Sequence, residues 1–293
     1  MNAGNPVKNL RDIRRSAGSH WVGDGFPVRT LFAYSGMGPA LSPFLLLDYA
    51  GPVEFPPTGE RLGVGEHPHR GFETVTIVYA GEVEHRDSSG GGGRIGPGDV
   101  QWMTAGSGLV HEEFHGRDFA QRGGLFEMVQ LWVNLPARVK MTPPRYQGIL
   151  NSQIPVVSLP GGVGSVRVIA GEYAGVKGPA ETFTPVHVWD LRLASEQAVE
   201  LVVPEGYTTA LVVLSGTIQP HDAEVIGAAE VGLFDRTGSV LRFDSAGNAT
   251  ALLLCGEPID EPIVGSGPFV MNTAEEIRQA MMDYRSGKMG RLS

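Results

Sequence analysis

Short apolar runs separated by glycine-rich turns dominate the pattern of hydrophobic and polar positions along the chain. Runs of strand length, rich in β-branched and aromatic residues, predict β-strands. In the first half of the chain they lie at residues 28–34, 44–49, 74–79, 100–103 and 128–134. In the second half they lie at residues 166–170, 186–193, 198–203, 210–214, 239–243 and 251–254. The pattern therefore predicts an all-β protein.

One segment near the C-terminus has the period of an α-helix instead. Thr273 is followed three residues later by Glu276, which has the form of a capping box. Apolar residues then recur at helical spacing and a glycine follows them: Ile277, Ala280, Met281, Tyr284 and Gly287. We expect a short C-terminal helix whose apolar side packs against the rest of the chain.

Prolines gather between the two sets of predicted strands, at positions 143, 144, 155 and 160. Similar strand–glycine–strand segments surround Gly81 in the first half and Gly216 in the second, which indicates a duplicated β domain. We therefore predict one domain over residues 1–142 and a second over residues 143–293 that ends in the helix.

Charge and composition narrow the classes of function. The chain has 293 residues, with 23 Lys and Arg against 32 Asp and Glu, for a net charge of −9. This balance argues against binding to nucleic acid or to an anionic membrane. Cys255 is the only cysteine, so an intramolecular disulfide and a cysteine-based zinc site are excluded. The N-terminus has no secretory pattern and no run is long enough for a membrane helix, so we expect a cytoplasmic protein.

Histidines carry the main chemical signal, because five of the eight lie between residues 67 and 115. On an extended strand, residues two apart point to the same side, so His67 and His69 can converge on one ion. By the same parity His111 and Glu113 share a face and Glu112 points away. Three imidazoles and one carboxylate leave open positions on a metal such as Fe(II), Mn, Ni, Cu or Zn. The sequence therefore predicts a metal site.

Two long segments, residues 65–74 and 98–113, resemble the signature of the pirin family within the cupin superfamily. Residues 130–135 and 267–273 are also similar to pirin sequences. The resemblance implies a bicupin, with two antiparallel β-barrels face to face and a metal in the N-terminal one. It implies the ligands His67, His69, His111 and Glu113. The C-terminal half has only two histidines and no HxH motif, so we predict no metal there.

Several neighbouring residues have open roles at this stage. The general cupin pattern would recruit Glu73 as the carboxylate ligand, and we keep it as the reserve. His85 and His115 are candidates for lining the pocket or for hydrogen bonds to the ligands, or are ordinary polar or surface residues. Four apolar residues can form either a wall for an aromatic ligand or, as we prefer, part of the core: Phe72, Trp102, Met103 and Phe126.

Bacterial pirins resemble quercetin 2,3-dioxygenases, which open a flavonol ring with O₂ and release carbon monoxide. The resemblance implies a flavonol-like aromatic substrate, O₂, and one divalent metal with Fe(II) as first choice. Glu113 would be both a ligand and the general base that takes the proton of the flavonol hydroxyl. The alternative is a metal- and redox-dependent regulatory protein that binds a transcription factor or a metabolic enzyme. A third reading is a non-redox cupin isomerase or binding protein.

Overall fold

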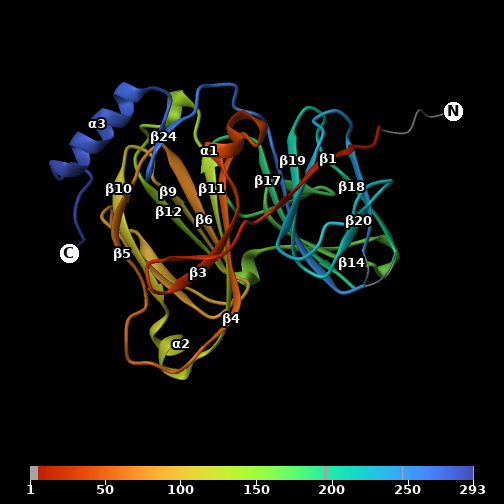
Figure 1. Cartoon of the computed structure of the whole chain (residues 1–293), viewed down its shortest axis with the longest axis horizontal. Helices are drawn as coiled ribbons and strands as arrows, with labels where there is room; N and C mark the ends of the chain where they lie inside the picture. The colour runs from red at the N-terminus through yellow and green to blue at the C-terminus, as the bar shows by residue number, and fades with distance from the viewer. Residues whose placement is uncertain (1–5, 195–196, 246, 293) are drawn as a thin grey trace. The chain divides into compact units, whose positions relative to one another are not determined.

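The computed structural model describes residues 6–194, 197–245 and 247–292, and their secondary structure is mostly β (Figure 1). Every strand predicted from the sequence is found, with ends shifted by a few residues. The described residues form two compact units. Unit 1 comprises residues 6–16, 40–43, 152–194, 197–245 and 247–258, and unit 2 comprises residues 17–39, 44–151 and 259–292.

Two sheets build unit 2. The larger sheet has the strand order β12 (Arg145–Ile149), β9 (Val100–Thr104), β6 (Phe72–Ala80), β11 (Gly124–Asn134), β4 (Phe44–Phe55), β3 (Phe26–Ala33) and β2 (His20–Val22). The smaller sheet has the order β5 (Gly63–His69), β10 (Leu109–His115), β7 (Val83–Asp87) and β8 (Gly92–Ile95). A core of buried apolar side chains lies in this unit, centred on Phe26, Phe119 and Phe126.

Unit 1 has a similar plan. Its larger sheet has the order β1 (Leu10–Arg15), β21 (Glu230–Phe234), β19 (Thr208–Ser215), β23 (Ala249–Gly256), β17 (Val186–Leu193), β14 (Gly164–Ala170) and β13 (Val156–Ser158). Its smaller sheet joins β18 (Ala198–Val202), β22 (Val240–Ser245) and β20 (Ile218–Pro220), and a two-stranded ribbon pairs β15 (Glu172–Tyr173) with β16 (Val176–Lys177). Trp189, Leu211 and Leu253 are at the centre of its core. In both units the strands form separate sheets of a cupin jelly roll rather than one closed barrel.

Helices are few and short among the described residues: α1 (Tyr34–Met37), α2 (Arg117–Arg122) and α3 (Ala274–Arg285), besides several 3-10 turns. The predicted C-terminal helix is confirmed as α3, and its N-terminus has the capping box, with Thr273 accepting from the Glu276 backbone N–H. Among these residues, no helix combines the length and apolar composition required to cross a bilayer.

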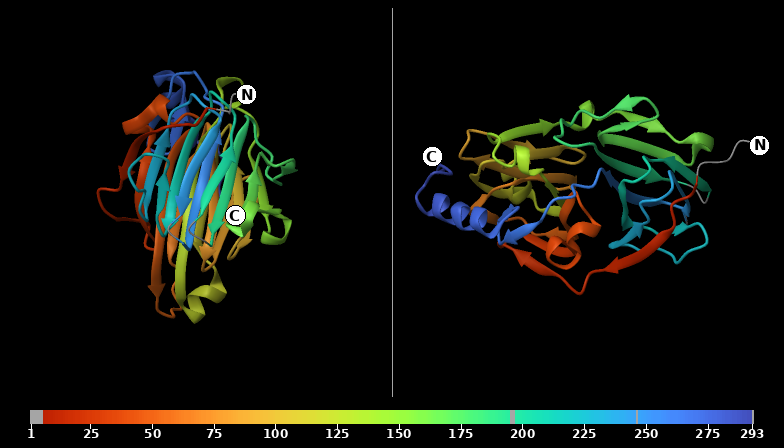
Figure 2. Two further views of the ribbon diagram at one scale, coloured as in Figure 1. Left: turned by 90° about the vertical axis from the view of Figure 1, so that its right-hand side faces the viewer. Right: turned by 90° about the horizontal axis from the view of Figure 1, so that it is seen from above.

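The structure divides the chain differently from the predicted boundary between residues 142 and 143. The N-terminal strand β1 pairs with β21 and so belongs to unit 1 with the second half of the chain. The C-terminal segment belongs to unit 2, where β24 (Val264–Ser266), β25 (Phe269–Met271) and α3 pack on Val110. The right-hand view of Figure 2 shows α3 alongside strands of the first half. Each end of the chain thus completes the unit formed by the opposite half.

Candidate metal centre

Three neighbouring strands of unit 2 carry the candidate residues on one face of the smaller sheet. In the antiparallel register, His67 of β5 lies opposite His111 of β10. On the other side of β10, β7 places His85 opposite Glu113 and Asp87 opposite His111. Because successive side chains alternate between the faces of a strand, residues two apart point the same way. The sheet therefore presents six polar side chains together: His67, His69, His85, Asp87, His111 and Glu113.

Gly71 sets the sharp turn that connects β5 to β6 directly after the histidine pair. Its φ is +89°, and a Cβ at this position would lie 2.0 Å from the carbonyl oxygen of Val270. Only glycine adopts this backbone conformation without strain. The neighbouring Arg70 is buried and donates from Nη1 to Asp283 of α3 over 2.9 Å. The C-terminal helix therefore supports the end of the strand that carries His67 and His69.

The three histidines His67, His69 and His111 bring one ring nitrogen each within 4.8 Å of one another. Nδ1 of His67 lies 2.8 Å from the carbonyl oxygen of Gly65, and Nδ1 of His69 lies 3.3 Å from that of Pro268. A carbonyl oxygen only accepts, so both Nδ1 atoms carry the proton. In the neutral ring Nε2 then has a free lone pair, which is the tautomer that binds a metal.

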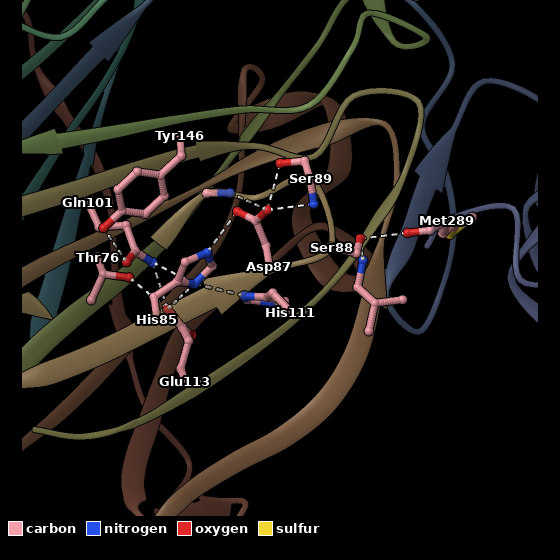
Figure 3. Close-up of polar contacts among 12 residues, drawn as sticks. Thr76, His85, Asp87, Ser88, Ser89, Gln101, His111, Glu113, Tyr146 and Met289 are labelled. Atoms are coloured by element: carbon pink, nitrogen blue, oxygen red, sulfur yellow. Dashed lines mark hydrogen bonds and ion pairs between the residues drawn. The ribbon is translucent and has the colours of Figure 1, made fainter. Parts of the chain in front are cut away.

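A hydrogen-bonded chain fixes the third imidazole in the same tautomer (Figure 3). Nε2 of His85 donates to Oδ2 of Asp87 over 3.1 Å, which leaves Nδ1 of His85 as an acceptor. Nδ1 of His111 lies 3.2 Å from that acceptor and donates to it. Nε2 of His111 therefore has the lone pair. We call this arrangement the Asp87–His85–His111 chain.

The electrostatics agree with these protonation states. Burial, together with the neighbouring imidazoles, lowers the pKa of His69 and of His111 well below the usual value, so both are neutral at pH 7. Burial raises the pKa of Asp87, but hydrogen bonds from His85, Ser89 and Gly91 outweigh it and lower this pKa to about 2. An ionised Asp87 can only accept hydrogen bonds, as the Asp87–His85–His111 chain requires.

Nε2 of His111 is buried and has no hydrogen-bond partner among the described residues. Buried polar atoms are paired in the great majority of cases, so an orphaned lone pair beside two others needs a partner. A divalent metal ion is the partner that three convergent imidazoles fit. The residues present therefore fit a metal, and this cluster of three histidines with a nearby glutamate is able to hold one.

Glu113 is held from the facing sheet of unit 2. Its Oε1 accepts a hydrogen bond from Nε2 of Gln101 over 2.9 Å. The Thr76 hydroxyl lies 3.4 Å from this oxygen, but it donates its single proton to Oε1 of Gln130 over 2.5 Å. Its Oε2 accepts from Nε2 of Gln130 over 3.2 Å. Glu113 groups within 4.8 Å with His85 and His111, and it is not in the group that His111 forms with His67 and His69. A metal shared with His67 and His69 therefore requires the Glu113 carboxylate to move. Each oxygen of Glu113 thus has one donor among the described residues and room for a further bond.

The donors to Glu113 belong to a longer line of polar residues across the larger sheet. Direct register neighbours on five adjacent strands are Thr30, Asp48, Gln130, Thr76 and Gln101. We call these residues the polar row. Residues that face one another in register share one side of a sheet, so the polar row faces the histidines from across the interior of unit 2.

A cavity of about 390 Å³ opens beside the histidines. At one end it is lined by polar groups of His67, His69, Glu113 and Gln130. The remaining wall is apolar except for Asp48, and consists of Val22, Phe26, Val28, Val64, Met128, Trp132 and Pro268. Such a cavity, mostly apolar with a few polar groups at one end, is typical of a small-molecule site.

Other residues considered from the sequence lie elsewhere. Glu73 is outside both histidine groups and accepts a hydrogen bond from Thr104, and burial raises its pKa to about 7. His115 donates from Nε2 to the Gly25 carbonyl and stacks on Phe126, so it belongs to an aromatic cluster. The four aromatic and methionine residues proposed as wall or core are buried core residues: Phe72, Trp102, Met103 and Phe126. Glu112 points away from the histidines, toward Arg61 and Arg86.

The polar row and Asp87 were not recognised from the sequence. The signal for Asp87 was present, because His85 and Asp87 have the same two-residue spacing as the other pairs. The signal for the polar row was a single polar residue in each of several apolar strands, as in FLLLDY around Asp48 and MVQLWV around Gln130.

Family models, known proteins and solved structures all include matches to this chain. The family models described as Pirin and as Pirin C-terminal cupin domain match residues 25–133 and 188–290. The chain is 56% identical over 282 residues to the Pseudomonas aeruginosa protein named "Putative quercetin 2,3-dioxygenase PA2418", covering 96% of this chain and 98% of the relative. It is 37% identical over 263 residues to human pirin, covering 85% of this chain and 83% of that protein. A crystal structure titled quercetin 2,3-dioxygenase from Acinetobacter baumannii has a TM-score of 0.96 and 53% identity, covering 98% of this chain and 100% of that one.

Proposed function

The chain belongs to the pirin family, and from this premise we propose that it is a metal-dependent dioxygenase that opens the ring of a flavonol with O₂ and releases carbon monoxide. The observation that supports this best is the orphaned Nε2 of His111, with His67 and His69 beside it, at the polar end of an apolar cavity. Relatives named for quercetin 2,3-dioxygenase activity support the choice of reaction.

In this proposal His67, His69 and His111 bind one metal ion through Nε2, and Glu113 completes the ligand set. Three imidazoles and a carboxylate suit Fe(II) and leave open positions, while Cu, Ni, Mn or Zn are alternatives. When bound, the metal would polarise the substrate oxygen and supply the redox chemistry that O₂ requires.

The protein residues prepare the substrate for that chemistry. A flavonol must lose the proton of its 3-hydroxyl to become electron-rich. The Glu113 carboxylate takes this proton, because it lines the cavity and each of its oxygens has a single donor and room for a further bond. Gln101 donates to Oε1 and Gln130 donates to Oε2, and the Thr76 hydroxyl fixes the Gln130 amide by donating to its Oε1. The apolar wall with Trp132 and Phe26 excludes water and contacts the flat ring system.

The test begins with protein purified anaerobically without a metal-affinity column. Metal content is measured by mass spectrometry, and O₂ uptake and CO release are measured after adding quercetin. One equivalent of metal, with CO released in proportion to O₂ consumed and faster than with free metal, is the expected result. Bound metal without O₂ uptake above the free-metal control would contradict the enzyme and favour the regulatory binding protein.

Glu113→Gln tests the proposed base. Because Gln can still bind a metal weakly through its carbonyl oxygen but cannot take a proton, we expect a larger loss of turnover than of metal. General bases contribute roughly 10²–10⁴-fold to rate. Glu112→Gln is the matched control, since Glu112 is the adjacent residue on the opposite face and binds Arg61 and Arg86. Equal losses of metal and turnover in Glu113→Gln would leave Glu113 as a ligand only.

A further inference from the structure

Asp48 is a carboxylate in the cavity wall that the proposed reaction does not use. It lies on β4 in the polar row, between Thr30 and Gln130. Its Oδ1 accepts a hydrogen bond from the Thr30 hydroxyl over 2.5 Å. Its Oδ2 has no hydrogen bond to any of the described residues, although the side chain lines the cavity. One carboxylate oxygen is therefore open toward a bound molecule.

The surroundings of this open oxygen favour a ligand that donates a hydrogen bond to it. Its neighbours in the wall include Val28, Met128 and Trp132, and burial raises the pKa of Asp48 above its usual value, against the hydrogen bond from Thr30. Asp48 is half-buried, so an apolar ligand that filled the cavity would remove water from this oxygen without replacing its hydrogen bonds, which is unfavourable. A hydroxyl or N–H of a ligand would restore the missing hydrogen bond.

The position of Asp48 relative to the metal end sets the distance that the ligand must span. Asp48 and Gln130 are direct neighbours on adjacent strands, and Gln130 donates to Glu113. Adjacent strands are roughly 4.8 Å apart, so the open oxygen lies roughly 5–10 Å from the Glu113 carboxylate. This separation corresponds to one or two fused six-membered rings.

We propose that Asp48 is a substrate-recognition residue, which accepts a hydrogen bond through Oδ2 from a second polar group of an aromatic substrate whose first hydroxyl lies at the metal end. This inference rests on the proposed function. It narrows the substrate class to aromatic molecules with hydroxyl groups at two places. It also disfavours a carboxylate in the ligand near Asp48, because the cavity-lining residues among those described include no Lys or Arg.

The test compares two flavonols that differ in their second polar group. Quercetin carries hydroxyls on all its rings, whereas 3-hydroxyflavone carries only the hydroxyl that would lie at the metal end. Binding is measured anaerobically on the metal-loaded protein, by the quenching of Trp132 and the other tryptophans. Asp48→Asn keeps the size of the side chain, and Asp48→Ser is the second variant. Asp118→Asn is the control, because Asp118 lies outside the cavity-lining residues and pairs with Arg94.

We expect both Asp48 variants to bind quercetin about 10- to 100-fold more weakly, as is typical when a hydrogen bond to a charged group is lost. Their affinity for 3-hydroxyflavone should stay within about 3-fold of the unsubstituted protein, with unchanged metal content and melting temperature. Equal losses for the two flavonols, or no loss for quercetin, would overturn the inference.

Failure of the reaction gives a different result from failure of recognition. If quercetin binds and the Asp48 variants lose affinity for it selectively, but no O₂ is consumed, recognition stands and the dioxygenase does not. If O₂ uptake and quercetin affinity are the same in Asp48→Asn as in the unsubstituted protein, the dioxygenase stands and the role of Asp48 is wrong. If neither flavonol binds, both proposals are wrong.

Discussion

Replacing Asp87 with Asn should weaken metal binding, although Asp87 is not itself a proposed ligand. It is connected to the proposed ligand His111 through the ring of His85. Oδ1 of Asp87 accepts from the backbone N–H and hydroxyl of Ser89 and from the backbone N–H of Gly91. Among the described residues, Oδ2 accepts only from Nε2 of His85. An asparagine would place its carbonyl oxygen against the three donors and turn its NH₂ group toward His85.

That exchange reverses the direction of each hydrogen bond in the Asp87–His85–His111 chain. Nε2 of His85 would have to accept, so its proton would move to Nδ1. Nδ1 of His111 would then accept from His85, and the His111 proton would move to Nε2, the atom that must bind the metal. Returning His111 to the metal-binding tautomer would break the hydrogen bond between His85 and the new asparagine. We take its free energy as about that of one hydrogen bond to a charged group, roughly 1.5–3 kcal/mol. The expected loss of metal affinity is therefore about 10- to 150-fold, close to the range typical of residues behind metal ligands.

The assay is an anaerobic titration of the metal-free protein with Fe(II) or Zn(II) in competition with a coloured chelator at pH 7. Histidine ¹⁵N NMR of the metal-free protein reports the tautomer of His111 directly. Asp99→Asn is the matched control, because Asp99 also accepts from backbone N–H groups in unit 2, those of Gly96 and Asn151. The reasoning is refuted if Asp87→Asn keeps its affinity within about 2-fold and His111 remains protonated at Nδ1.

Three further predictions concern stability, each measured by urea unfolding. Gly71→Ala should cost at least about 2 kcal/mol because of its positive φ and the contact described above, whereas Gly18→Ala, with no atom within 4 Å of the added Cβ, should be near neutral. Thr273→Ala should cost about 1 kcal/mol through loss of the α3 cap, and no change would contradict the capping box. Hydrogen bonds from Lys288 and Arg70 lower the pKa of Asp283 to about 2, below its unfolded value of about 3.9, so its stabilisation is present above about pH 4 and is lost as the pH falls toward 2. The difference in stability between the unsubstituted protein and Asp283→Asn should shrink over that range, and a constant difference would contradict the pKa.

The sequence predicted the parts of the fold that depend on local patterns. Alternation and β-branched runs predicted the strands, and the capping box with its apolar stripe predicted α3. Domain boundaries depend on which distant strands pair, and no local pattern encodes that β1 pairs with β21. The exchange of the two chain ends between the units was therefore beyond the reach of periodicity.

The same distinction applies to the candidate site. The two-residue spacing that selected His67 with His69 also relates His85 to Asp87, yet spacing alone does not say which strands are neighbours. Only the register, with β10 between β5 and β7, brings the three pairs onto one face.

The polar row shows how isolated residues acquire a function through pairing. Each of its members is a polar residue within a different strand. In a single sequence, one such polar residue does not indicate a functional site. Register aligns them, so that Gln130 and Gln101 donate to Glu113 and Thr76 donates to Gln130. Asp48 keeps one oxygen open to the cavity. Burying so many polar groups is unfavourable unless each has a partner. The hydrogen bonds to Glu113 meet this requirement at one end of the row, and a ligand that donates to Asp48 would meet it at the other. The same need for a hydrogen-bond partner applies to the polar groups of the fold and to those that a substrate covers. The open oxygen of Asp48 therefore indicates that the cavity binds a molecule with a hydrogen-bond donor.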